Sequence, residues 1–257
     1  MKKIILISIL LIANNVFACQ CSITKLIDRF HKSEFIAKVK VIKVSEYNAE
    51  NYYQNAEIEI IDLYKGSKIN NIKISNNLQS SCGLYVPENS VWLIFAQIDS
   101  NGNLSFGYCS GSIQIDKTMI SEKYPNAEKN RKKSIERKLS VLKFLSVKNT
   151  QNENKYNLRL YYSKECANDF KGYEVNKSKF AIYEITIEKD LRISNIKPLQ
   201  EFDNKELSKE IIKCMNENLK VDNRKISEIP NSSKITIIYY YYEAEKQDKS
   251  FIGEFDL

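Results

Sequence analysis

The chain has 257 residues, of which 43% are hydrophobic and 28% are charged, with 7 glycines and 4 prolines. This composition excludes a wholly disordered chain and a collagen-like fibre, and the length is enough for one large or two small hydrophobic cores. The formal net charge is +7. The basic residues are scattered along the chain, so a nucleic-acid partner is not expected. The only histidine, His31, argues against histidine-rich metal sites and against Ser/His/Asp or Cys/His catalysis.

Residues 1–18 have the features of a signal peptide. Two lysines follow the first methionine, an apolar run covers residues 4–13, and small or β-branched residues precede Cys19 at the positions that signal peptidase reads. We therefore expect cleavage before Cys19 and a secreted or periplasmic mature protein. The apolar run is too short to cross a bilayer, and no later segment is long enough, so no transmembrane segment is expected. Acylation of Cys19 after a lipoprotein signal fits less well, because Phe17 occupies a position where a small residue is preferred.

Six cysteines follow the predicted cleavage site. They are Cys19, Cys21, Cys82, Cys109, Cys166 and Cys214. An even number of cysteines in an exported chain indicates disulfides. Four lie before residue 110 and two after residue 160, which indicates two bridges in one domain and one in another. Zinc at Cys19-x-Cys21 is disfavoured, because this spacing is tighter than that of common zinc motifs and export favours oxidation.

The first half of the chain predicts a small barrel. Apolar residues at helical spacing between Ile23 and Phe30 predict a short amphipathic helix. Alternating or continuous apolar runs then predict five short strands, at 35–44, 56–64, 69–75, 91–98 and 104–108. Turn signals stand at Lys65-Gly66 and at 99–103. Several short strands after an early helix are typical of a closed barrel.

A long amphipathic helix is predicted after the barrel. Within residues 126–147, Ile135, Leu139, Leu142 and Leu145 recur at helical spacing, and lysines and arginines occupy the other face. We expect this helix to pack on the barrel and to close an N-terminal domain of residues 19–147. A helix lying on a membrane surface is the alternative. The polar segment 148–155 has no periodicity and is the best linker candidate.

Residues 156–257 predict a small α+β domain. Patterns for a β-hairpin, a helix and a last strand follow one another at 180–196, 204–219 and 234–243. Cys214 lies near the apolar stripe of this helix, and Cys166, before the hairpin, is its natural partner. The four consecutive tyrosines at 239–242 are interpreted as strand residues shared between core and surface, with a binding face as the alternative. The predicted fold class is therefore mainly β with α.

Six short motifs follow one another over residues 19–115. In chain order they are Cys19-Gln20-Cys21, Glu34–Val39, Tyr64-Lys65-Gly66, Ser81-Cys82-Gly83, Trp92–Ala96 and Tyr108-Cys109-Ser110. In this order the region resembles the tissue inhibitors of metalloproteinases, which belong to the netrin-like OB-fold family. The resemblance implies a five-stranded OB-fold barrel. It also implies disulfides between Cys19 and Cys82 and between Cys21 and Cys109.

The same resemblance implies an inhibitory mechanism. Cys19 would chelate the zinc of a metalloprotease through its α-amine and its carbonyl oxygen, and Gln20 would enter the specificity pocket. The rest of the inhibitory ridge would be formed by Cys21, Ser22, Ser80, Ser81 and Cys82. The protein would need no cofactor and no metal of its own. The sequence departs from the family where Gln20 replaces a small hydroxyl residue, where a third bridge of this domain is absent, and in the C-terminal domain.

Residues 156–257 resemble, in element order, the C-terminal domain of TonB-type proteins. This resemblance implies contacts with other envelope or extracellular proteins, through an exposed strand edge. The alternative function is therefore a cell-envelope protein-interaction module, lipidated or not, that uses the barrel only as a scaffold. An enzyme is not expected, because the sequence has no Gly-x-Ser-x-Gly motif, no glycine-rich phosphate loop and no carboxylate–histidine metal motif.

Overall fold

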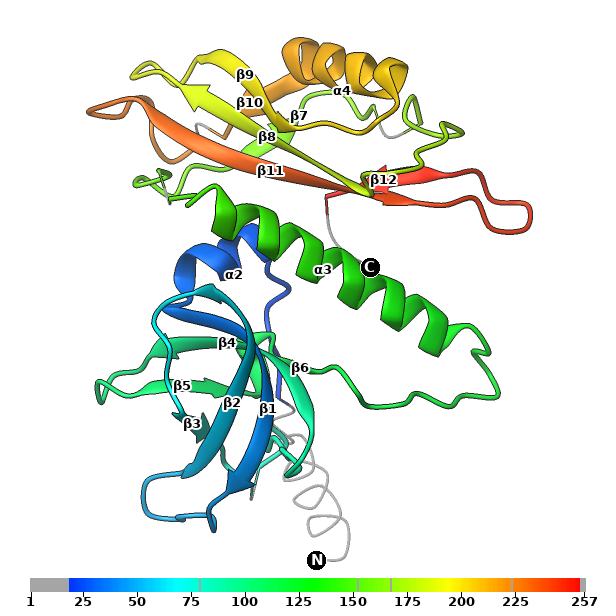
Figure 1. The fold of residues 1–257 in the computed structure, drawn as a ribbon. Coiled ribbons are helices and arrows are strands. Elements are labelled where there is room, and N and C mark those ends of the chain that lie inside the picture. Colours follow the sequence, from blue (N-terminus) through cyan, green and yellow to red (C-terminus); the bar gives the residue numbers. More distant parts are fainter. Residues whose placement is uncertain (1–18, 79, 152, 167, 223, 255–257) are drawn as a thin grey trace, which may run out of the picture. The chain divides into compact units, whose positions relative to one another are not determined.

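The computed structural model describes residues 19–254, except 79, 152, 167 and 223. The predicted signal peptide lies outside the described residues. The chain forms two compact units (Figure 1). The first comprises the described residues up to Ile23 together with Lys32–Lys117, and the second comprises Thr24–His31 together with the described residues from Thr118 onward.

The first unit is a closed five-stranded barrel. Its strands are β1 (Phe35–Val44), β2 (Tyr53–Lys65), β3 (Asn71–Ser75), β4 (Val91–Ile98) and β5 (Leu104–Gly107). They pair in the order β1-β2-β3-β5-β4, and β1 pairs with β4 to close the barrel. The β3–β5 pair is parallel, whereas the other pairs in the ring are antiparallel. This topology confirms the predicted OB-fold-like barrel. Two short elements follow, the 3-10 helix η1 (Tyr108–Ser110) and β6 (Ile113–Gln114), which pairs with β4.

The core of the barrel follows from the alternation of apolar residues along its strands. On β1, Phe35, Ala37, Val39 and Val41 point to the interior and are fully or almost fully buried. On β4 five consecutive residues, 92–96, are buried, as the continuous apolar run predicted. The single tryptophan, Trp92, is part of this core, and its indole N–H donates to Ser90 Oγ. Trp92 is therefore an intrinsic fluorescent probe of the barrel.

Gly66, after β2, is required by both its backbone angle and its surroundings. Its φ is +90°, and a Cβ at this position would lie 2.6 Å from the carbonyl oxygen of Glu34. Gly102 also has a positive φ, +75°, but has nothing within 4 Å of such a Cβ. Both substitutions strain the backbone at a positive φ, but only Gly66→Ala adds a steric clash. We therefore expect Gly66→Ala to lower the free energy of unfolding by about 1–3 kcal/mol more than Gly102→Ala. Denaturant unfolding followed by Trp92 fluorescence measures both, and equal losses would contradict the clash.

The second unit is built on a four-stranded antiparallel sheet. Its strands β8 (Phe180–Ile187), β9 (Ile193–Gln200), β11 (Ser233–Tyr242) and β12 (Phe251–Gly253) lie in the order β12-β11-β8-β9. Two short strands, β7 (Leu160–Tyr162) and β10 (Leu219–Val221), form a separate antiparallel pair. Helix α4 (Lys205–Asn218) covers one face of the larger sheet, and α3 (Ala127–Val147) runs along the other (Figure 1). The N-terminus of α4 is capped by Asn204, whose side chain accepts from Leu207 N.

The four tyrosines at 239–242 are strand residues of β11. Tyr239 and Tyr241 belong to the hydrophobic core of this unit, and Tyr240 is also buried. Tyr242 is half-buried and stacks on Phe251, with 4.7 Å between ring centroids. The tyrosines therefore stabilise the sheet on both of its faces.

Helix α3 is part of the second unit, as are residues 26–31 of the short helix α2 (Leu26–Lys32). The Phe144 ring lies edge-on to Phe180 at 6.1 Å, and Lys133 pairs with Glu243 on β11. The sequence-based boundary placed this helix in the N-terminal domain and a linker at 148–155, so the compact units divide the chain differently. The predicted apolar stripe of α3 is buried at Ile135, Leu142 and Leu145. Among the described residues, no helix is long and apolar enough to cross a membrane.

The carboxylate of Glu243 is held between two lysines of the second unit. It accepts from Lys133 Nζ at 2.9 Å and lies 3.1 Å from Lys179 Nζ, and these interactions lower its pKa to about 2. Because the pKa in the folded state is below the value of about 4.3 in an unfolded chain, the stabilisation is present above pH 4.3 and is lost as pH falls toward 2.

We expect Glu243→Gln to remove part of the acid dependence of stability between about pH 5 and pH 2. The loss at neutral pH should stay below about 1 kcal/mol, because half of the side chain is exposed and solvent screens the pairs. Thermal unfolding at several pH values, followed by tyrosine circular dichroism, measures the effect. Glu245→Gln is the matched control, since Glu245 lies 4.0 Å from Lys133 Nζ. Identical pH profiles for wild type and Glu243→Gln would show that the pairs contribute nothing.

Candidate functional site

The candidate site lies where two parallel strands of the barrel end. Parallel neighbours place their carboxyl ends at the same edge of a sheet. Strand β3 ends at Ser75, which is paired with Gly107 at the end of β5. The segment after β3 carries Cys82, and η1 after β5 carries Cys109. The pairing of β3 with β5 therefore brings together two cysteines from distant parts of the sequence.

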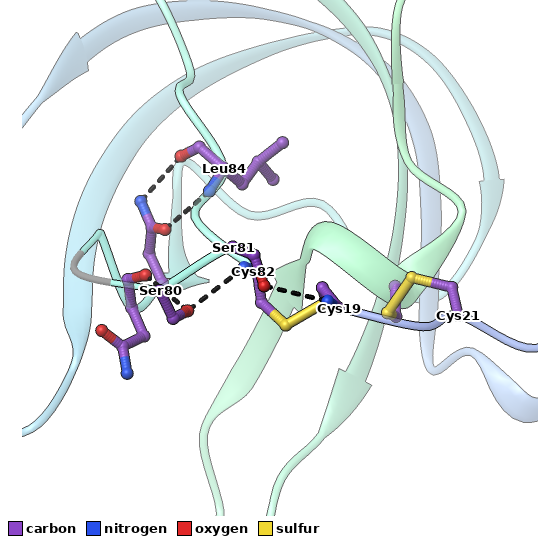
Figure 2. The surroundings of a disulfide bond; sticks show 9 residues. Cys19, Cys21, Ser80, Ser81, Cys82 and Leu84 are labelled. Atoms are coloured by element: carbon purple, nitrogen blue, oxygen red, sulfur yellow. Dashed lines mark hydrogen bonds between the residues drawn. A yellow bond between two sulfur atoms is a disulfide. The ribbon is translucent and has the colours of Figure 1, made fainter. Parts of the chain in front are cut away.

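Two disulfides attach the N-terminal segment to this end of the barrel. Cys19 is bonded to Cys82 and Cys21 to Cys109, each with 5.2 Å between Cα atoms (Figure 2). A third disulfide joins Cys166 to Cys214 within the second unit. These are the pairs expected from the sequence. Because a free terminal segment would normally fray, the first two bridges determine where residues 19–22 lie.

The seven predicted ridge residues lie in two segments that the Cys19–Cys82 bridge joins, and we call them the N-terminal ridge. It comprises Cys19, Gln20, Cys21, Ser22, Ser80, Ser81 and Cys82. Cys19 and Cys82 are half-buried, and the other five are exposed. The backbone nitrogen of Cys19 donates a hydrogen bond to Ser81 Oγ at 2.9 Å, as Figure 2 shows. The ridge is therefore open to a partner, while its first residue is fixed by both a covalent bond and a hydrogen bond.

The loop that carries Ser80, Ser81 and Cys82 is stabilised by a side chain that the sequence analysis did not identify. Asn76 is 2% exposed. Its Oδ1 accepts from Leu84 N, and its Nδ2 donates to Leu84 O, each at 2.7 Å. Within the loop, Ser80 Oγ accepts from Cys82 N and donates to Asn77 O. The only sequence signal for this clamp is an asparagine immediately after a predicted strand, which is too common to single out.

The segments that carry the ridge cysteines also carry exposed apolar side chains. Ile23 is 87% exposed and Tyr85 is 80% exposed, and about half of Leu78 and of Tyr108 is exposed. Large apolar side chains left in water near one surface are typical of protein interaction sites. The sequence analysis did not predict these residues as functional, because exposure cannot be read from residue type.

The ridge holds a cluster of sulfur atoms but, while these cysteines are oxidised, the cluster offers no thiolate to a metal. The sulfur atoms of Cys19, Cys21 and Cys109 lie within 4.8 Å of one another, and all three are in disulfides. The thiolate is the form that binds metals, and a disulfide has none. His31 belongs to the second unit and is not part of the ridge.

Fold and site together define a class of protein. It is an OB-fold-like barrel with its N-terminal ridge fastened by disulfides, followed in the chain by an α+β unit with a disulfide of its own. No protein-family model matches the chain, and a search of the curated proteins found no match.

Proposed function

We propose that the exported protein inhibits a zinc metalloendopeptidase through its N-terminal ridge. The observation that supports this proposal best is the position of the Cys19 nitrogen. It lies on an exposed ridge, next to the bridge to Cys82, and donates to the Ser81 hydroxyl. Cleavage before Cys19 would turn this nitrogen into a free α-amine.

The chemistry of an N-terminal cysteine suits chelation. An α-amine has a pKa of about 8, so a usable fraction is neutral at pH 7 and has a lone pair for a metal. The amine and the carbonyl oxygen of the same residue would bind the protease zinc as a five-membered ring. They would displace the water that catalytic zinc sites keep in their open position. A hydrogen bond from the amine to Ser81 would leave the nitrogen lone pair free for the metal.

Gln20 would provide specificity. Its side chain is exposed next to Cys19, where it can enter a pocket beside the zinc. A buried glutamine amide must find hydrogen-bond partners or it costs binding energy. The target protease should therefore have a polar specificity pocket rather than a purely apolar one.

The proposal is tested with two forms of the protein that differ by one residue. One begins at Cys19, and the other carries one additional alanine before it. The additional residue turns the amine into an amide that cannot chelate, so inhibition across a panel of zinc endopeptidases should weaken at least about 100-fold, or about 2.7 kcal/mol. Equal Trp92 fluorescence and equal melting temperatures would show that the fold is unchanged. Equal potency of the two forms would reject chelation.

A second candidate function is a protein-interaction module of the cell envelope, with the barrel as a scaffold. The exposed Ile23 and Tyr85 favour it, because they offer an apolar contact that does not require a metal. Intact mass of the naturally exported protein separates the two candidates. An unmodified start at Cys19, with two hydrogens gained per disulfide on reduction of the three bridges, is required for chelation. A lipid on Cys19 would exclude chelation and would support the interaction module.

A further inference from the structure

The two disulfides of the N-terminal ridge bring three sulfur atoms close together. The sulfurs of Cys19, Cys21 and Cys109 are within 4.8 Å of one another, and the sulfur of Cys82, which is bonded to that of Cys19, is the fourth. We propose that, once both ridge bridges are reduced, these four cysteines form a tetrathiolate site for Zn²⁺. The proposal does not depend on protease inhibition, and it concerns the reduced chain, to which the expectation of oxidation on export does not apply.

The distances suit such a site. In a tetrahedral zinc site the Zn–S distance is about 2.3 Å, which places neighbouring sulfurs about 3.8 Å apart. The sulfurs of Cys21 and Cys109 therefore have to approach that of Cys19 by no more than about 1 Å, while the two sulfurs of each broken bridge move apart to the same spacing. Rotation about the side-chain bonds of exposed cysteines can provide movements of this size.

Two of the four ligands are held by the barrel independently of the bridges. Cys82 lies in the loop that Asn76 clamps through two hydrogen bonds to Leu84. Cys109 lies in η1, directly after β5, which pairs with β3. Reduction breaks none of these interactions. The Cys19-x-Cys21 arm then supplies the other two thiolates from one short segment, so metal binding would replace the bridges as the fastening of the ridge.

The chemistry balances with a dithiol as the reductant. Each bridge takes up two electrons and two protons and becomes two thiols, while the dithiol becomes a disulfide. Zn²⁺ then displaces the four thiol protons and leaves a site with a charge of −2. Affinity should increase with pH, because binding releases protons. Cys21 and Cys109 are exposed, so both the reductant and the ion have access to the ridge.

The third bridge provides a matched control. Cys166 and Cys214 lie in the second unit, and within the described part of the chain their sulfurs are not part of a cluster of three or more metal-binding groups. A pair of thiols alone is a poor zinc site, since structural zinc takes four ligands. Removing this pair should leave metal binding unchanged.

The experiment titrates the reduced, full-length mature chain with Cd²⁺, a spectroscopic substitute for Zn²⁺, and then with Zn²⁺ in competition. We expect one ion per chain and a thiolate-to-cadmium charge-transfer band. The double variant Cys166→Ser/Cys214→Ser should behave like wild type. The double variant Cys21→Ser/Cys109→Ser loses two of the four ligands and should bind the metal at least about 100-fold more weakly. Removing only a residue that hydrogen-bonds to a metal ligand already weakens binding by about 10- to 100-fold.

Three outcomes would overturn the proposal. They are no binding by the reduced wild type, equal binding by Cys21→Ser/Cys109→Ser, and equally tight binding by the oxidised chain. Trp92 fluorescence reports whether the barrel is folded during the titration. If reduction unfolds the barrel and the metal refolds it, the site is supported, because binding then drives folding. If the barrel stays unfolded and binds no metal, the proposal is wrong.

Discussion

The double variant Cys19→Ser/Cys82→Ser is expected to lose about 4 kcal/mol of the free energy of unfolding of the barrel. The bridge joins residues 63 positions apart. Closing a loop of that length removes about this much chain entropy from the unfolded state. A typical domain is stable by only about 5–15 kcal/mol, so the variant would be marginally folded. Both cysteines are replaced because a single free thiol at Cys19 would lie within 4.8 Å of the Cys21–Cys109 bridge and exchange with it.

Denaturant unfolding followed by Trp92 fluorescence measures this loss, because the only tryptophan of the chain reports on the first unit. The control is Cys166→Ser/Cys214→Ser, which removes a bridge of the second unit between residues 48 positions apart. That variant should leave the transition reported by Trp92 in place and shift only the tyrosine signal. A Trp92 midpoint that does not respond to loss of Cys19–Cys82 would mean that the barrel does not depend on this bridge.

Phe106→Ala is expected to destabilise the barrel by about 3–5 kcal/mol. Phe106 is 1% exposed, and its ring centroid lies 6.2 Å from that of Trp92. Replacement by alanine removes buried apolar surface and leaves a cavity that a closed barrel cannot readily collapse. Because β5 also positions η1, and thereby Cys109, the ridge should become less protected from reductants as well.

The comparison for this prediction is Tyr108→Ala, two residues further along the chain. Tyr108 is 49% exposed, so its loss should cost less than about 0.5 kcal/mol. The Trp92 emission should shift in Phe106→Ala and stay constant in Tyr108→Ala, because only Phe106 contacts the indole from within the core. Similar losses in the two variants would contradict the burial of Phe106.

Strands with strong apolar patterns were predictable from the sequence. The bounds of β1 and β4 agree with the predicted segments, because alternation and a continuous apolar run each carry several residues of signal. Strands β6, β7, β10 and β12 were not predicted. Each is two or three residues long, so its pairing depends on the partner strand rather than on its own pattern.

The candidate site was predictable only where cysteines mark it. Pairing of the ridge cysteines came from a family resemblance, and the structure forms the same pairs. The Asn76 clamp and the exposed Ile23 and Tyr85 carry no distinctive sequence pattern, because hydrogen-bond partners and exposure arise from tertiary structure.

The division of the chain also determines an order of folding during synthesis. Helix α2 is made before any strand of the barrel, yet residues 24–31 belong to the unit whose other residues come after Lys117. The compact unit that contains residues 24–31 can therefore be completed only after the residues that follow Lys117 have been added. The barrel is thus expected to be completed first, and the unit that contains the earliest helix last.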